Sequence, residues 1–593
     1  MSSIRLKATF QFANLTRAEG LSVEANEIGG GTYNLGQTDT QGQIDRAIRD
    51  RRTVQVPNNP LIPSAGTHEE NDPRDQPMFT LTISDDQGHS FTTVPIAHGA
   101  LDGFRFVLPP SIPAGGPSRR ANAALKDKAD GKVPGWVFLV RKNGVGWAHS
   151  VRGLARLPGP GISPAPMSLD TILHIASMSK PICATALVAM IEDWGRIQKA
   201  ITGLRTGATI PKSPFTFVLN EPGQPSRQVA SFSVPTVLAP LFSDRGVARE
   251  LVSANLLGSV ATDPGVSAIV AFANWNALTV TPAPVVPPGH LGLLRRVLSG
   301  EGPPAYTTPF LGLIQARLSA TAASVGGAVQ IATGVNLITL DQLLRHRTNL
   351  QGGLWDRTMS SVPGWAEAQP DESGGQATFR LWPYVLLHLR QALATATTGY
   401  LNDNYTMLGA VIEACTETTY DRFVEQRLFS DPRFSTIRRR VVAPANAARY
   451  YQGAAPLFTG GVAFPSYTGW SAAGGFYATA NQITDWMHVL RSREPVRQVT
   501  GNSPLLSPAS VATLFGSTYF SGGGTDTLRG TVTSHRHNGG TSVTGGSVNG
   551  KLSILDGPGA SIHTAFFAAN GSLGGDAAFD PTMDELVQDP DWS

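Results

Sequence analysis

The chain has 593 residues, of which 41% are hydrophobic and 15% are charged, with a formal net charge of +3. An apolar fraction this high excludes a largely disordered chain, and charges this sparse and scattered disfavour a nucleic-acid partner. The two cysteines, Cys183 and Cys415, are too few for a disulfide framework or a cysteine-based metal site. No stretch is apolar enough to cross a bilayer, and Met1 to Phe10 lacks the apolar core of a signal peptide, so we expect a cytoplasmic protein without membrane contact.

The first hundred residues have the alternation of β-strands. Apolar side chains alternate from Ile4 to Phe12, and the segments Phe79–Ile83 and Ser90–Val94 flank a turn that contains Asp and Gly. We predict a β-sandwich-like accessory domain over residues 1–108. Proline and glycine crowd residues 109–118, which predicts a semi-rigid linker and a second domain from about residue 119.

The second domain starts with a predicted hairpin and a buried helix. The segments Trp136–Arg141 and Val145–Arg152 are joined by Asn143-Gly144, a dipeptide suited to the positive φ angles of a tight turn. Further along, Ile182–Trp194 is apolar nearly all round and is followed by Gly195. This pattern predicts a helix inside the domain that ends at that glycine.

A serine and a lysine directly precede the predicted helix. Ser177 and Lys180 are three residues apart, so on a helix their side chains share a face and the lysine amine can reach the serine hydroxyl. A serine in the first turn also lies near free backbone N–H groups, which favour developing negative charge. By itself this pattern is common in long chains, and the competing interpretation of Ser177 is an ordinary helix cap.

Two later segments strengthen the hypothesis. Tyr400 lies two residues before Asn402 on a predicted loop that enters a helix, so both side chains can face one site. His537, Gly539 and Gly540 lie beside a glycine-rich predicted strand, where the backbone N–H of Gly540 can complete an oxyanion hole.

In these segments the chain resembles the serine β-lactamase and penicillin-binding protein superfamily, and most of all class C β-lactamases, family VIII carboxylesterases and D-aminopeptidases. The resemblance extends from about residue 120 to 575. Six ordered segments carry it: 134–136, 170–180, 338–346, 400–409, 472–480 and 537–539. It implies an α/β (α+β) fold, with an antiparallel sheet flanked by helices and an all-helical subdomain, and a serine hydrolase domain over 119–593 interrupted by an insertion at about 222–335.

The resemblance also implies the roles of the site residues. Ser177 is expected to attack an acyl carbon and form an acyl-enzyme, while Lys180 and Tyr400 share general-base work. We expect the Lys180 ammonium to keep Tyr400 partly phenolate, and desolvation to bring Lys180 toward its neutral form. Asn402 is expected to orient Lys180 or a substrate amide, and the backbone N–H groups of Ser177 and Gly540 to hold the oxyanion. The sequence leaves open whether Lys180 or Tyr400 is the base.

One departure from the family bears on the substrate. His537-Asn538-Gly539 stands where many β-lactamases have Lys-Thr-Gly, and a histidine is largely neutral at pH 7. Substrates without a carboxylate, namely carboxylic esters or small amides, are therefore favoured over β-lactams. Arg347-Thr348-Asn349 also replaces the usual Thr-Ser-Gly, which predicts a remodelled wall, and the preceding His346 is expected to be structural.

Several alternatives stay open. The enzyme is expected to need no cofactor and no metal, although His535 and His537 share a strand face and suggest a metal hydrolase as a minor alternative. A D-aminopeptidase, a β-lactamase-type amide hydrolase, an acyltransferase and a binding protein that retains the fold are the others. The sequence allows a homo-oligomer. The insertion is expected near the mouth of the site, as a lid, a wall or a subunit contact.

Overall fold

The computed structural model describes the backbone of seven strands within residues 4–106 and, side chains included, most of residues 116–592. The longest gaps in the second part are residues 244–263 and 352–380. Linker residues 109–115 lie outside the described residues, and the helix that follows already begins at Gly116.

The strands of the first part form two small antiparallel sheets. The larger has the order β2-β1-β4-β5, with β6 also paired to β4, and the smaller joins β3 to β7. Their bounds are β1 (Ile4–Phe12), β2 (Ser22–Asn26), β3 (Val54–Val56), β4 (Pro77–Asp85), β5 (Ser90–Thr92), β6 (Ile96–Ala97) and β7 (Phe104–Phe106). The predicted strand at Ile4–Phe12 is confirmed, and the two segments predicted to flank a turn contribute to β4 and β5, which pair with each other.

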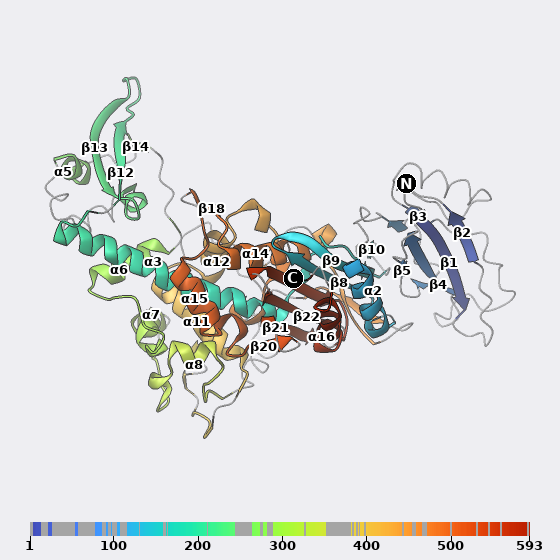
Figure 1. Cartoon of the computed structure of the whole chain (residues 1–593). Helices are drawn as coiled ribbons and strands as arrows, with labels where there is room; N and C mark the ends of the chain where they lie inside the picture. Colours follow the sequence, from blue (N-terminus) through green and yellow to red (C-terminus); the bar gives the residue numbers. More distant parts are fainter. Residues whose placement is uncertain are drawn as a thin grey trace.

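A nine-stranded antiparallel sheet forms the centre of the second part (Figure 1). Its order is β10-β9-β8-β23-β22-β15-β16, while β21 pairs with β22 and β20 with β21. The bounds are β8 (Gly135–Lys142), β9 (Val145–Arg156), β10 (Ala165–Pro166), β15 (Tyr450–Gln452), β16 (Thr459–Val462), β20 (Asp526–Leu528), β21 (Val532–Val543), β22 (Gly546–Asp556) and β23 (Ile562–Ala569). Asn143 (φ 48°) and Gly144 (φ 80°) make the predicted tight turn between β8 and β9.

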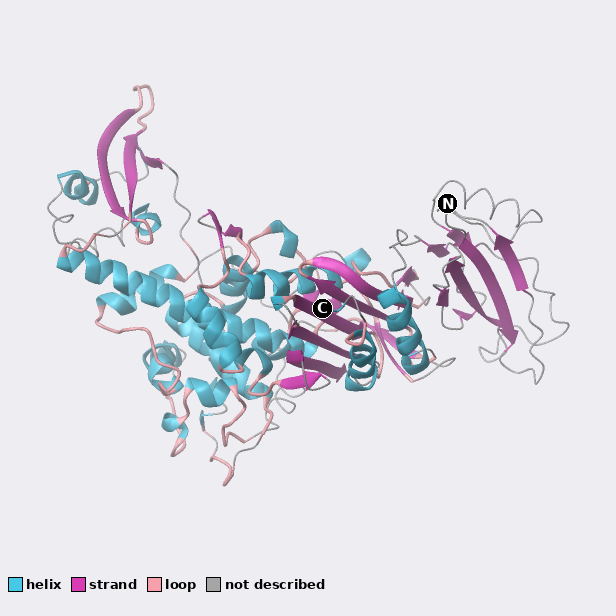
Figure 2. Ribbon diagram, in the orientation of Figure 1, coloured by secondary structure: helices cyan, strands magenta, loops and turns pink. Residues whose placement is uncertain are grey.

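Both faces of this sheet are buried, which gives a layered fold (Figure 2). Along β8, Phe138 and Val140 belong to a core with α2 (Gly116–Ala129) and α16 (Gly575–Leu586). The alternate residues Val137 and Leu139 belong to the larger core on the opposite face. Side chains alternate across a strand, so an apolar strand can serve two layers at once.

The larger core surrounds the long helix α3 (Lys180–Thr206). The predicted end of this helix at Gly195 is wrong, because a single helical glycine costs only about 1 kcal/mol and the next three turns bury apolar side chains. The helix ends instead at Gly207, which adopts the left-handed conformation (φ 68°). The helices around it are α6 (His290–Leu298), α7 (Phe310–Ser324), α8 (Leu340–Leu344), α11 (Asn402–Thr416), α12 (Tyr420–Leu428), α13 (Ser471–Gly474) and α15 (Pro508–Gly516).

A buried ion pair ties α3 to α12. The Arg427 guanidinium donates from Nε and Nη2 to the two carboxylate oxygens of Asp193, at 2.7 and 3.2 Å. Burial disfavours the charged carboxylate, but the charge of Arg427, the interactions with His290 and the Arg427 hydrogen bond together outweigh this effect and lower the pKa of Asp193 overall.

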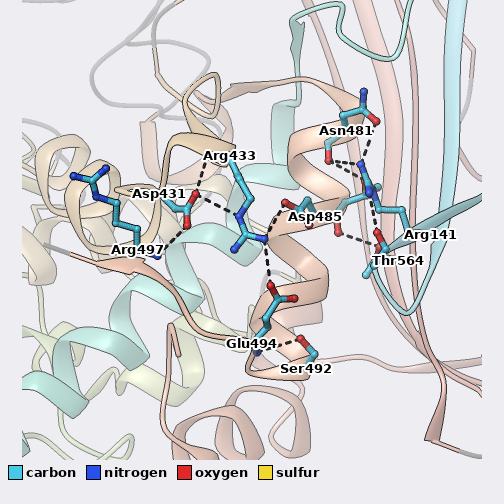
Figure 3. A network of polar contacts seen from close by, with 11 residues as sticks. Arg141, Asp431, Arg433, Asn481, Asp485, Ser492, Glu494, Arg497 and Thr564 are labelled. Carbon is cyan, nitrogen blue, oxygen red and sulfur yellow. Dashed lines mark hydrogen bonds and ion pairs between the residues drawn. The ribbon is translucent and has the colours of Figure 1, made fainter. Parts of the chain in front are cut away.

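A polar network joins the sheet to α14 (Ala480–Ser492), as Figure 3 shows. Arg141 of β8 donates from Nε to Thr484 Oγ1 at 3.0 Å, and the Thr564 hydroxyl of β23 donates to the Thr484 carbonyl at 3.0 Å. On the other side of α14, Arg433 lies 3.8 Å from Asp485. Because α14 follows β17 (Tyr477–Ala478) directly, these contacts also fix the position of that short strand.

A separate small sheet at the far end of α3 lies partly within the predicted insertion at 222–335, since its first strand precedes that range. Its strands are β12 (Lys212–Leu219), β13 (Arg227–Pro235) and β14 (Leu278–Thr281), next to α5 (Pro264–Ala271). A 27-residue helix is about 40 Å long. Ser177 precedes α3, whereas this sheet follows the other end of the helix (Figure 1). The sheet therefore lies away from the site, although we expected the insertion at the mouth of the site.

The remaining described elements are short. They are β11 (Leu173–His174), β18 (Val496–Gln498), β19 (Gly501–Ser503), η2 (Ala176–Ser179), η3 (Ala239–Ser243), η6 (Val335–Leu337), η7 (Pro432–Phe434), η8 (Pro444–Asn446) and η10 (Tyr519–Ser521). Among the described residues, no helix combines the length and the apolar character that a membrane span requires.

Candidate active site

Ser177 lies in the turn η2, immediately before α3. The residue before it, Ala176, adopts a left-handed conformation (φ 46°), which costs a non-glycine residue about 1–3 kcal/mol. The His174 imidazole supports this turn, because its Nδ1 accepts the Ala176 N–H at 3.3 Å. The turn holds Ser177 just below the surface, with 8% of the residue exposed.

Lys180 lies beneath the serine and contacts three oxygens. Its Nζ is 2.8 Å from Ser177 Oγ, 2.7 Å from Asn402 Oδ1 and 2.7 Å from the Ala473 carbonyl oxygen. The side chain is fully buried, and this desolvation holds the pKa of the Lys180 amine well below 10.5. The structure thus brings together Ser177, Lys180 and Asn402, three of the residues predicted for the site.

Tyr400 covers this cluster from the solvent side and is 52% exposed. Lys180 Nζ lies 4.8 Å from the centre of its ring, and its hydroxyl is hydrogen-bonded to Ser177. Desolvation raises the pKa of Tyr400 to about 12, although the bond to Ser177 opposes the shift. The expectation of a partly phenolate Tyr400 is therefore wrong, because desolvation of the phenol is the largest influence on its pKa.

Strand β21 passes directly against the nucleophile turn. A Cβ atom on Gly539 would lie 2.6 Å from the Ile175 carbonyl oxygen and 2.8 Å from Met178 Cε. Only glycine permits so close an approach without displacing the strand or the turn. Gly540, the next residue of β21, is paired with Asn549 of β22.

His537 comes from the same strand and is uncharged. Burial lowers its pKa to about 3, with a further contribution from Lys180. Its Nδ1–H donates to the Asn538 carbonyl oxygen at 2.7 Å, and its ring centre lies 6.1 Å from that of Tyr400. The predicted proximity of His537 to the site is present, as a neutral imidazole.

His535 faces a different environment. Its ring packs edge-on against Phe515 at 5.0 Å, and its Nε2 is 3.7 Å from an Asp556 carboxylate oxygen. Across the part of the chain that the structure describes, no three His, Cys, Asp or Glu side chains are grouped so that they could hold a metal ion.

His346, expected to be structural, lies beside Tyr400. The Arg347 N–H donates to the Gln342 carbonyl at 2.8 Å and the His346 N–H to the Leu343 carbonyl at 3.3 Å, the pattern that ends a helix with a left-handed residue. His346 takes that position (φ 53°), where glycine is usual and another residue costs about 1–2 kcal/mol. Its ring centre lies 4.4 Å from that of Tyr400.

Two features of this site have little signal in the sequence. The Ala473 carbonyl acts through the backbone, so no side-chain pattern could indicate it. His346 follows the short helix α8, whose start has the ordinary capping box of Thr339 and Gln342. Nothing in that pattern distinguishes the residue after the helix. The left-handed histidine after that helix becomes apparent only from the backbone angles.

Residues 330–567 match the family model described as Beta-lactamase. This chain carries a β-lactamase-like domain. The matched range includes Tyr400, Asn402 and the segment 537–540. Ser177 and Lys180 precede it and join it through the contacts described above.

A comparison with solved structures finds similarity at low sequence identity. A D-stereospecific amidohydrolase from Streptomyces sp. is 12% identical, with 79% of this chain and 97% of that chain covered and a TM-score of 0.42. The hydrolase EstCE1, described as having promiscuous acyltransferase activity, is 14% identical over 79% and 97%, with a TM-score of 0.41. A class C β-lactamase from Rhodobacter sphaeroides is 13% identical over 80% and 99%, with a TM-score of 0.40. No curated protein matches the chain. The β-lactamase-like domain agrees with the predicted fold, an antiparallel sheet flanked by helices and joined to a helical part.

Proposed function

We propose that this protein is a serine hydrolase that cleaves a carboxylic ester or a small amide through a covalent acyl-enzyme on Ser177. The observation that carries the proposal is the position of Lys180 Nζ, 2.8 Å from Ser177 Oγ and within 2.7 Å of two oxygens that can only accept hydrogen bonds.

Counting hydrogen atoms on Lys180 supports its role as the base. A neutral amine has two N–H groups and one lone pair. The Asn402 and Ala473 oxygens take the two N–H groups, so the lone pair faces the Ser177 hydroxyl and can accept its proton. Because burial favours the neutral amine, this base is available without a further partner.

Tyr400 fits the complementary role of acid. Its phenol stays protonated at neutral pH and is hydrogen-bonded to Ser177, so it lies next to the atom at which the acyl bond forms. We propose that Tyr400 donates its proton to the leaving oxygen or nitrogen when the tetrahedral intermediate collapses. The proton that Lys180 removes from Ser177 can then restore the phenol.

The oxyanion is assigned to the backbone N–H groups of Ser177 and Gly540. The close approach of β21 at Gly539 supports this proposal, because it holds the following residue of the strand near the nucleophile turn. The neutral His537 favours substrates without a carboxylate, since it offers a hydrogen bond and no positive charge.

A chromogenic ester tests the proposal. We expect a burst of released chromophore stoichiometric with enzyme, absent in Ser177→Ala and retained in Ser226→Ala, a change on the remote β12–β13 connection. A binding protein that retains the fold gives no burst at any pH. Esters, D-amino-acid amides and β-lactams assayed side by side then fix the substrate class, and acyl transfer appears as product formed with an added alcohol.

A further inference from the structure

The His346 imidazole accepts hydrogen bonds from the segment that carries Tyr400. Its Nδ1 accepts the backbone N–H of Leu401 at 3.1 Å, and the Asn404 Nδ2 group lies 3.3 Å from the same atom. Leu401 stands between Tyr400 and Asn402, so this one imidazole nitrogen holds the backbone that joins the two site side chains.

The partner of Asn404 fixes the direction of these bonds. The Thr348 hydroxyl donates to Asn404 Oδ1 at 2.8 Å, which turns the amide NH₂ group toward His346. Thr348 and Asn404 are both buried. With two donors directed at Nδ1, the His346 proton belongs on Nε2, which is buried and has no hydrogen-bond partner.

The ring itself packs between two tyrosines. Its centre lies 4.4 Å from the Tyr400 ring and 5.1 Å from the Tyr405 ring, with interplanar angles of 34° and 37°. Tyr405 is fully buried and its hydroxyl donates to the Leu344 carbonyl oxygen at 3.1 Å. A half-exposed Tyr400 thus rests on a ring that is backed by the core.

We propose that His346 is a positioning residue, which holds the Tyr400 phenol against Ser177 through the Leu401 N–H and through the contact between the two rings. This inference rests on the proposed function, because it assumes that Tyr400 protonates the leaving group. It assigns His346 no contact with substrate. The left-handed backbone of His346 is then tolerated because glycine, which suits that conformation better, offers neither the acceptor nor the ring.

The leaving group of the substrate provides the test. An alkyl ester needs a proton on its departing oxygen, whereas a p-nitrophenyl ester leaves readily without one. We expect His346→Gly to lower kcat/KM for the alkyl ester about 10²-fold, the scale of a misplaced catalytic group, and to affect the p-nitrophenyl ester much less. Tyr400→Phe should likewise impair cleavage of the alkyl ester more than cleavage of the p-nitrophenyl ester. In the variant that carries both substitutions, kcat/KM for the alkyl ester should fall no further than in the more impaired single variant.

Arg493→Gly is the matched control. Arg493 ends α14 in the same left-handed conformation (φ 62°), so the substitution makes the same change of backbone freedom away from Tyr400. We expect both esters to be cleaved at the wild-type rate. His346→Asn is tested in parallel, because asparagine tolerates left-handed angles and lacks the ring. It should show the same leaving-group preference as His346→Gly, and it replaces that variant in the test if His346→Gly does not fold.

The possible failures are distinguishable. Three results overturn the positioning role of His346 while leaving the effect of Tyr400→Phe on the alkyl ester intact. They are equal losses of kcat/KM on both esters in the His346 variants, additive losses in the double variant, and wild-type rates in the His346 variants. Wild-type rates on both esters in Tyr400→Phe overturn the acid role of Tyr400 and the positioning role that rests on it. The proposed function itself fails separately, if Ser177→Ala keeps the acylation burst.

Discussion

Replacing Lys180 with methionine is the substitution that the structure interprets most fully. Lys180→Met keeps an unbranched side chain of similar length but removes the amine that faces Ser177. A general base contributes about 10²–10⁴-fold to a rate, so we expect acylation to slow by about 10³-fold. That loss corresponds to about 4 kcal/mol of activation free energy.

The same change should affect stability less. Two acceptors, Asn402 Oδ1 and the Ala473 carbonyl, lose a donor, which costs about 1–3 kcal/mol for each group left unpaired. Burying a thioether instead of a desolvated amine offsets part of this cost. The two acceptors together cost about 2–6 kcal/mol before this offset. We therefore expect the free energy of unfolding to fall by about 2 kcal/mol, the lower end of that range, compared with about 4 kcal/mol of activation free energy.

Stopped-flow measurement of the acylation burst over a range of pH is the assay. In the wild type the base must be neutral, so the acylation rate should fall as pH drops below the lowered pKa of Lys180 and level off above it. Lys180→Met should lose this limb. A variant within tenfold of the wild-type rate, or one that keeps the same pH limb, would refute Lys180 as the base.

Three further substitutions test the fold around the site. Gly195→Ala should raise the free energy of unfolding by about 1 kcal/mol in a denaturant titration, because a Cβ there meets no atom within 4 Å; a decrease would contradict the helix geometry. Gly539→Ala should slow acylation by at least about tenfold, since its Cβ would displace the Ile175 carbonyl and with it the nucleophile turn; an unchanged rate would show that β21 is not pressed against that turn. Asp193→Asn should cost about 3–5 kcal/mol by leaving the Arg427 charge buried without its partner. Because the folded pKa of Asp193 is lowered, the wild-type advantage should be complete above its unfolded pKa of about 4 and shrink as pH falls below that value; an advantage independent of pH would argue against the ion pair.

Local patterns in the sequence predicted much of the fold. The turn at Asn143-Gly144 follows from the positive φ angles that these residues tolerate, and the strand at Ile4–Phe12 from its apolar alternation. The same reasoning failed at Gly195, where the apolar surface buried beyond the glycine outweighs its helix propensity.

The site was predictable as far as it consists of side chains in recognisable motifs. Ser177, Lys180 and Asn402 come together because the packing of α3 against α11 fixes their distances, and short motifs at the starts of both helices indicate these residues. The protonation states were not predictable, since the pKa of Tyr400 depends on how strongly packing desolvates Lys180 and Tyr400 itself. His346 reaches the site through a helix end and a backbone N–H, neither of which leaves a pattern in the sequence.

Mapping the covalent intermediate is the most direct test of the account. The enzyme is mixed with an activated acyl ester, quenched in acid within the burst, digested and analysed by mass spectrometry, with Ser177→Ala treated in parallel. The account predicts one acyl group on the peptide that contains Ser177, and none on the variant. An acyl group on another residue, or full turnover by Ser177→Ala, would contradict it.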